Sequence, residues 1–129
     1  MNSSYYYSQM KRYKTNKNNA NKEKEKYENL LEKIRELKKG LSPIVEDLMD
    51  AETNFKNGGY VDKGVTFDNG VLKECYNKIS NDIETLDSLV NSYQNKINGL
   101  KKDINGYQKK YETAKSNYQK AKAIESRGA

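Results

Sequence analysis

The chain of 129 residues contains no histidine and no tryptophan, and it has one cysteine and one proline. Without histidine, catalysis by Ser-His or Cys-His pairs and metal ligation by imidazole are excluded. Cys75 alone can form neither an internal disulfide nor a cysteine-based zinc site. We therefore expect neither an enzyme nor a protein that holds a cofactor or a metal.

Long hydrophobic runs are absent as well. No apolar stretch approaches the roughly 18 residues that a transmembrane helix needs, and residues 1–11 lack the apolar core of a cleaved signal peptide. The sequence thus predicts a cytoplasmic protein that does not insert into a membrane. If it is exported, we expect a route that needs no cleaved signal peptide.

Charged residues make up 33% of the chain and hydrophobic residues 34%, which fits either long solvated helices or disorder. The placement of the apolar residues favours order. From residue 72 onwards they follow an unbroken alternation of four and three: Leu72, Tyr76, Ile79, Ile83, Leu86, Val90, Tyr93, Ile97, Leu100, Ile104, Tyr107, Tyr111, Ala114, Tyr118 and Ala121. This spacing predicts a helix with a coiled-coil seam.

The first half repeats the pattern less strongly. One column recurs every seven residues: Tyr13, Ala20, Tyr27, Ile34, Leu41, Leu48 and Phe55. We assign Leu30, Leu37, Ile44 and Ala51 to its companion column. Ser42-Pro43 could start a new helix, since serine caps helices and proline favours their first position. The heptad phase nevertheless continues past them, which predicts one long helix with a bend.

A glycine-rich stretch separates the two patterns. Gly58 or Gly59 can end the first helix, and Asp68 or Asn69 can cap the second. Short apolar runs on both sides of residues 62–64 predict a small β-hairpin between them. The predicted fold is therefore all-α: a single domain over 1–129 that forms a long antiparallel two-helix hairpin (coiled coil), with helices at about 5–56 and 70–124 and a tip at 57–69.

The predicted seam is wider than two helices need. Adjacent apolar pairs thicken it, among them Cys75-Tyr76, and a third apolar position per heptad is typical of a helix bundle. A lone hairpin would leave part of this face wet, so we expect further helices from another protein or from a second copy. The predicted partner-binding residues are Leu30, Leu31, Ile44, Val45, Leu89, Val90, Tyr93, Ile97, Tyr107 and Tyr111.

Tyrosine is unusually frequent, with 11 tyrosines against 2 phenylalanines. The run Tyr5-Tyr6-Tyr7 opens the chain, and four more tyrosines lie in the second half of the second pattern. An antiparallel hairpin would bring these two regions side by side. The rings either fill the open end of the hairpin or form a recognition site, because an aromatic ring with a polar handle suits both.

The net charge of +6 would also suit nucleic acid, and lysines cluster between residues 11 and 26. Glu23, Glu25 and Glu28 are interleaved with them, however, so a solvated helix face explains the run, and we expect no nucleic-acid binding. Acidic residues near Gly64 suggest a calcium loop, but their spacing does not match an EF-hand.

Three features resemble a known family: the Tyr-rich start Ser4-Tyr5-Tyr6-Tyr7, the two heptad arms, and the segments 55–59 (FKNGG) and 67–70 (FDNG). The chain resembles the YwqH-like proteins of the Gram-positive type VII secretion system, which are similar to WXG-type hairpins and are encoded beside LXG toxins. The tip motif carried over by this resemblance consists of Phe55, Gly58, Gly59, Phe67, Asp68 and Gly70.

The resemblance implies a helical adaptor or chaperone that binds the N-terminal helical LXG domain of a toxin, with or without a second small helical protein, and promotes its export. This sequence departs from the family in two ways. It has no Trp-x-Gly tripeptide, and no tyrosine or phenylalanine is followed four residues later by an acid. The usual export signal is therefore missing, so the partner would have to supply it. The alternative is a homo-oligomeric structural coiled coil without a role in secretion.

Overall fold

The computed structural model describes residues 2–57 and 69–128, which form two helices. Helix α1 spans Ser3–Asn57 and helix α2 spans Asn69–Gly128. The described residues contain no strand, so the all-α prediction is confirmed for them. The predicted β-hairpin lies outside the described residues, and so do four residues of the tip motif: Gly58, Gly59, Phe67 and Asp68. The other two, Phe55 and Gly70, lie in the last turn of α1 and the first turn of α2.

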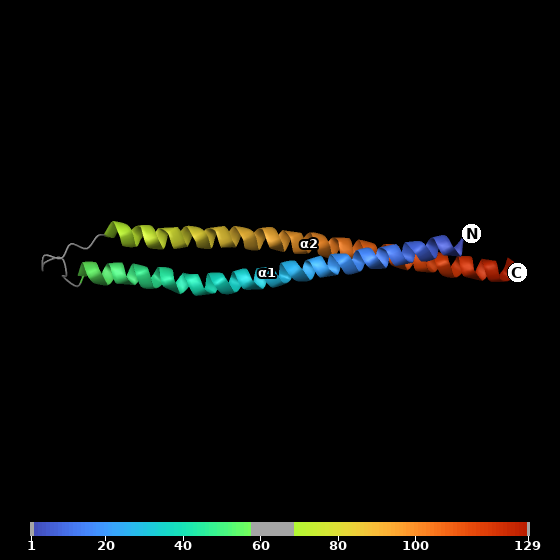
Figure 1. The fold of residues 1–129 in the computed structure, drawn as a ribbon, viewed down its shortest axis with the longest axis horizontal. Coiled ribbons are helices and arrows are strands. Elements are labelled where there is room, and N and C mark those ends of the chain that lie inside the picture. The colour runs from blue at the N-terminus through green and yellow to red at the C-terminus, as the bar shows by residue number, and fades with distance from the viewer. Residues whose placement is uncertain (1, 58–68, 129) are drawn as a thin grey trace. The chain divides into compact units, whose positions relative to one another are not determined.

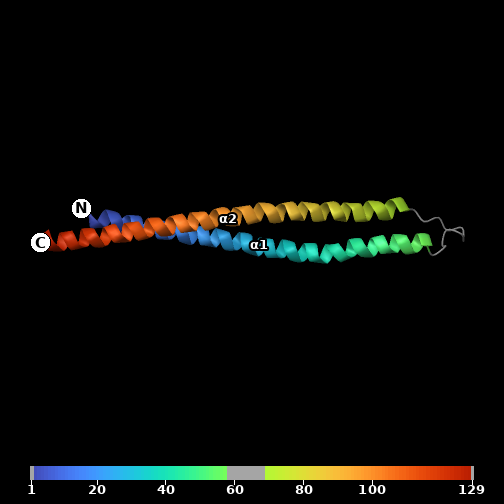
Figure 2. The same cartoon turned by 180° about the vertical axis from the view of Figure 1, so that it is seen from behind.

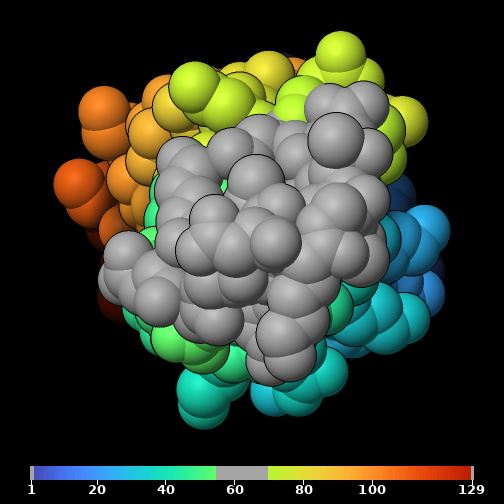
Figure 3. All heavy atoms as spheres, turned by 90° about the vertical axis from the view of Figure 1, so that its left-hand side faces the viewer, coloured from blue at the N-terminus to red at the C-terminus, as the bar shows by residue number. Residues whose placement is uncertain are grey.

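The chain packs as two compact units, each of which pairs one stretch of α1 with one stretch of α2. Unit 1 contains residues 2–29 and 93–128, and unit 2 contains the described residues between 30 and 92. Within each unit the two stretches lie side by side and run in opposite directions (Figures 1 and 2). In the end-on view of Figure 3, the α2 residues of unit 2 (yellow-green) and its α1 residues (cyan to green) lie on opposite sides. Antiparallel helix pairing is thus confirmed within each unit.

The seam on α2 consists of the residues that the heptad pattern predicts. All fifteen positions, from Leu72 to Ala121, are buried or half-buried. Three of them are almost completely covered: Ile97 is 3% exposed, Ala114 is 2% exposed and Ala121 is 0% exposed. A 3,4 alternation places neighbouring members on one helix face, so within each unit the α1 stretch can cover the seam residues of the α2 stretch.

The seam on α1 differs from the prediction in one column. The column that contains Tyr27, Ile34 and Leu41 faces α2 as expected. Its companion column begins one residue later than predicted and consists of Met10, Lys17, Lys24, Leu31, Lys38, Val45 and Glu52. The predicted companions Leu30, Leu37, Ile44 and Ala51 are exposed. Either companion column keeps a 3,4 spacing with the column of Ile34. The sequence prediction chose the column of Leu30 because it is more apolar than that of Leu31, and this choice is wrong.

Lysines in the α1 seam reach polar partners on α2. In unit 1, Lys17 Nζ donates a hydrogen bond to Gln108 Oε1 at 2.7 Å. In unit 2, Lys38 Nζ forms an ion pair with Asp87 Oδ1. The methylene stems of these lysines cover the seam while the ammonium groups stay at its edge. Lys38 lies three heptads after Lys17 on α1, and Asp87 lies three heptads before Gln108 on α2. The two helices therefore pair in the same register within each unit.

Helix α1 is capped at its start from two directions. Asn2 Oδ1 accepts a hydrogen bond from the Ser4 backbone N–H at 3.0 Å, as an N-cap residue does. Glu125 of α2 accepts two more, from the Ser3 backbone N–H at 3.0 Å and from the Ser3 hydroxyl at 2.8 Å. The first turn of α1 contains no acidic residue, so Glu125 supplies the negative charge that favours a helix N-terminus.

Helix α1 continues without interruption through Pro43, which confirms that Ser42-Pro43 does not separate two helices. Proline has no N–H, so one helical hydrogen bond is lost at this point. The Ser42 hydroxyl donates to the Lys38 carbonyl oxygen at 3.1 Å, one turn earlier. Because Pro43 is exposed, its ring does not displace the seam.

Candidate protein-binding surface

Four apolar residues of α1 in unit 2 recur every seven positions outside the seam: Leu30, Leu37, Ile44 and Ala51. We call them the outer column. Leu30 is 42% exposed, Leu37 55% and Ile44 44%. The outer column also keeps a 3,4 spacing with the seam residues Ile34, Leu41 and Leu48, which lie next to it on the helix. This stretch of α1 therefore carries two apolar faces, and α2 covers one of them.

Leu89 of α2 lies on the same side of the seam as the outer column. In unit 1, Lys110 Nζ lies 5.8 Å from the centroid of the Tyr13 ring. The same register holds in unit 2, where Ile34 corresponds to Tyr13 and Leu89 corresponds to Lys110. The register therefore places Leu89 next to Ile34. Leu89 is exposed. The heptad register thus assigns Leu89 to the side of the seam on which the outer column lies.

Cys75 was predicted to lie in the apolar stripe, and this prediction is wrong. The Cys75 side chain is exposed, while its neighbour Tyr76 occupies the buried seam position. The two residues are adjacent on a helix and so point about 100° apart. The free thiol is consequently open to solvent.

The ten predicted partner-binding residues divide into two groups. Three are exposed: Leu30, Ile44 and Leu89. The other seven belong to the seam and are buried or half-buried: Leu31, Val45, Val90, Tyr93, Ile97, Tyr107 and Tyr111. A seam residue is reached only if the two helices separate, so the candidate surface consists of the exposed group with Leu37. Leu37 was not among the predicted partner-binding residues. It lies seven residues from both Leu30 and Ile44, and this spacing could have identified it.

In unit 1, tyrosines of α1 lie beside tyrosines of α2, as predicted for an antiparallel hairpin. The Tyr7 and Tyr118 rings are 5.7 Å apart between centroids, and those of Tyr27 and Tyr93 are 5.5 Å apart. Lys11 Nζ lies 4.8 Å from the Tyr7 ring centroid, a cation–π distance. Rings from the two helices thus pack against each other, while Tyr5 and Tyr7 remain exposed.

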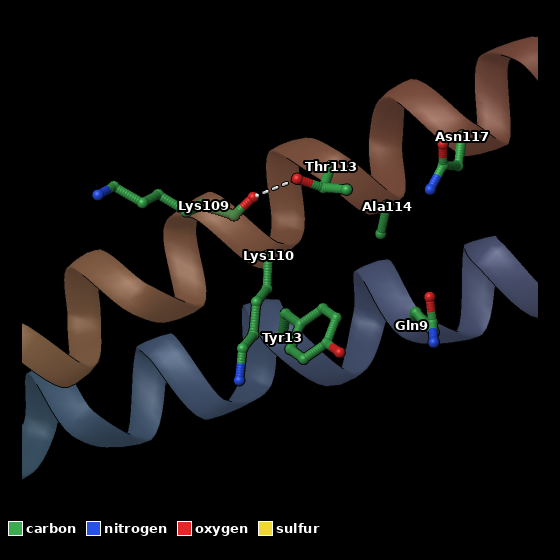
Figure 4. A pocket seen from close by; sticks show the side chains of 7 residues that line it. All are labelled: Gln9, Tyr13, Lys109, Lys110, Thr113, Ala114 and Asn117. Atoms are coloured by element: carbon green, nitrogen blue, oxygen red, sulfur yellow. Dashed lines mark hydrogen bonds between the residues drawn. The ribbon is translucent and has the colours of Figure 1, made fainter.

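An open pocket of about 220 Å³ lies between the two helices of unit 1 (Figure 4). Its lining residues are Gln9, Tyr13, Lys109, Lys110, Thr113, Ala114 and Asn117. The Thr113 hydroxyl donates to the Lys109 carbonyl oxygen at 3.1 Å and is occupied within its own helix. The lining contains no carboxylate and no thiol, and its ionisable side chains are Tyr13, Lys109 and Lys110.

Within residues 2–57 and 69–128, no three cysteine or acidic side chains are grouped so that they could hold a metal ion. Neither α1 nor α2, over its described length, contains a stretch that is both long and apolar enough to cross a bilayer.

Comparison of the chain with protein-family models, with curated proteins and with solved structures finds no match.

Proposed function

We propose that this protein is a helical adaptor that binds another helical protein through the outer column of α1. The supporting observation is the exposure of Leu30, Leu37 and Ile44 at heptad spacing beside a seam that α2 already covers. Exposed apolar residues that recur along one face of a helix suit an interaction site. An apolar stripe on a helix suits a partner helix that presents its own residues at positions i, i+3, i+4 and i+7.

The resemblance to YwqH-like proteins suggests the class of the partner. It points to the N-terminal helical LXG domain of a type VII secretion toxin, with this chain as its targeting factor or chaperone. A long helical domain offers the continuous apolar face that the outer column requires. Because this chain lacks the aromatic-x-x-x-acid signal, we propose that the toxin or a second small helical protein supplies it.

A homo-oligomeric structural coiled coil is the alternative, because a second copy presents the same apolar column. The two functions differ in what binds. An adaptor forms a complex with an LXG domain, whereas a structural coiled coil associates only with itself.

Co-expression with an LXG domain, followed by size-exclusion chromatography, tests the adaptor function. We expect the two chains to elute together. The double variant Leu37→Ser/Ile44→Ser should lose this co-elution, since it removes apolar surface without touching the seam. The control Lys39→Ser/Glu46→Ser changes two exposed residues at the same spacing on another side of α1 and should retain it. Binding that survives in the first variant would place the contact elsewhere, and failure of the unmodified chain to bind any LXG domain would reject the function.

A further inference from the structure

We propose that the outer column is covered by a second copy of the chain when no other partner is bound, in an antiparallel contact whose two-fold axis passes close to Gly40. This inference goes beyond the proposed function and does not depend on it. It rests on three features of one exposed face of α1: the order of its apolar residues, the placement of its charges and a glycine at its centre.

The exposed face consists of the outer column and a second column, whose residues alternate along the chain at spacings of three and four. In chain order it reads Leu30, Lys33, Leu37, Gly40, Ile44, Asp47 and Ala51, and all seven residues are exposed. Leu37 lies three residues before Gly40, and Ile44 lies four residues after it. A second α1 packed antiparallel about Gly40 therefore places Leu37 beside Ile44 of the other copy, twice by symmetry.

The charges on this face complement each other under the same two-fold rotation. Lys33 lies seven residues before Gly40 and Asp47 lies seven residues after it. An antiparallel copy brings Lys33 level with Asp47 of the other chain on both sides of the axis. A parallel copy in register would place Lys33 against Lys33 and Asp47 against Asp47, which is unfavourable. Charge complementarity thus selects the antiparallel arrangement.

Gly40 fits the position of the axis. Glycine inside a helix is less favourable than alanine because its backbone loses more conformational freedom on folding. Among the described residues nothing requires glycine here, since a Cβ atom at residue 40 would meet no atom within 4 Å. At a two-fold axis the missing side chain lets the two α1 backbones approach closely and lets the leucine and isoleucine on each side interlock.

The contact is isologous, so it closes after two copies. The outer column is also the surface to which we assign the adaptor function, so the second copy and a partner helix compete for it. Binding of a partner is then an exchange, in which one chain of the dimer is replaced by a helix of the other protein.

Sedimentation equilibrium of the full chain tests the dimer. We expect association of the 14.9 kDa chain into a species of twice that mass. Lys33→Asp or Asp47→Lys alone should raise the dissociation constant about tenfold, because each turns two attractive pairs into repulsive ones. The double variant Lys33→Asp/Asp47→Lys should restore wild-type affinity. The controls Lys39→Asp and Glu46→Lys, which change the same charges outside this face, should leave the affinity unchanged.

Disulfide cross-linking locates the axis independently. In a Cys75→Ser background, Gly40→Cys should form a disulfide-linked dimer under mild oxidation, because two residues at a close two-fold contact lie within about 7 Å of each other between Cα atoms. Lys39→Cys in the same background is the control and should cross-link far less.

Three results would overturn the proposal: a chain that stays monomeric at every concentration, single charge reversals that behave like their controls, or equal cross-linking at residues 39 and 40. These results leave the adaptor function untouched, since that function is measured by co-elution with an LXG domain. Conversely, a chain that dimerises as described but binds no LXG domain would reject the adaptor function alone.

Discussion

Ser3 at the start of α1 donates its backbone N–H and its hydroxyl to the two carboxylate oxygens of Glu125 in α2, 122 residues away. These two hydrogen bonds stabilise the ionised carboxylate. They are the main reason why the pKa of Glu125 lies below the ordinary glutamate value, with smaller contributions from Lys122 and the N-terminal amino group; partial desolvation opposes them.

This lowered pKa gives the Ser3–Glu125 contact a defined pH dependence. Because the pKa is lower in the folded chain than in the unfolded chain, the stabilisation is present above the ordinary glutamate pKa. It is lost as the pH falls through the lowered value. We expect the Ser3 amide proton resonance, followed by NMR, to titrate below the ordinary glutamate range. In Glu125→Gln this titration should vanish, and its persistence there would assign it to another group.

The adjacent residues Leu30 and Leu31 are predicted to respond differently to truncation. Leu31 is 5% exposed in the seam, so Leu31→Ala should lower the free energy of unfolding by about 2–3 kcal/mol. Leu30→Ala removes an exposed side chain and should cost less than about 1 kcal/mol in the isolated chain. Urea unfolding followed by circular dichroism measures both. Equal losses would mean that the seam is assigned to the wrong column.

A seam lysine is predicted to be replaceable by leucine with a gain in stability. Lys24 lies in the seam column, and its ion pair with Glu28, at 3.6 Å, joins partly exposed groups one helical turn apart. Such pairs contribute only a few tenths of a kcal/mol. Lys24→Leu should therefore raise the free energy of unfolding by roughly 1 kcal/mol through apolar burial. Lys26→Leu, at an exposed position, is the matched control and should bring no gain.

Cys75 is predicted to react freely in the folded chain. Its side chain is exposed, so a thiol reagent reaches it without unfolding of α2. We expect labelling by 5,5′-dithiobis(2-nitrobenzoate) to proceed at similar rates in the native chain and in urea. A native rate many times slower, and restored by urea, would show that the thiol is covered.

The seam of α2 could be predicted from the sequence because only one arrangement fits it. Its apolar residues fill two columns over fifteen positions, whereas the neighbouring column alternates the apolar Cys75 and Leu89 with the charged Asp82 and Lys96. A helix with one apolar stripe has one face to bury. All fifteen residues are accordingly buried or half-buried in the structure.

The seam of α1 could not be predicted with the same certainty, because Leu30 and Leu31 both keep a 3,4 spacing with Ile34. Periodicity alone cannot tell which of two neighbouring columns faces the other helix. The structure uses the more polar column, and the aliphatic stems of Lys17 and Lys38 make this feasible. Because α2 packs against the column of Leu31, the outer column remains exposed. The candidate binding surface can therefore be identified only once the structure shows which face of α1 packs against α2.

The predicted separation of the seam from the binding surface is tested most directly by sedimentation equilibrium of Leu37→Ser/Ile44→Ser beside Lys39→Ser/Glu46→Ser. We expect the first variant to stay monomeric with unchanged helical content by circular dichroism, while the second associates like the unmodified chain. Association of the Leu37→Ser/Ile44→Ser chain with unchanged affinity, or loss of its helices, would contradict the assignment of the outer column as an association surface.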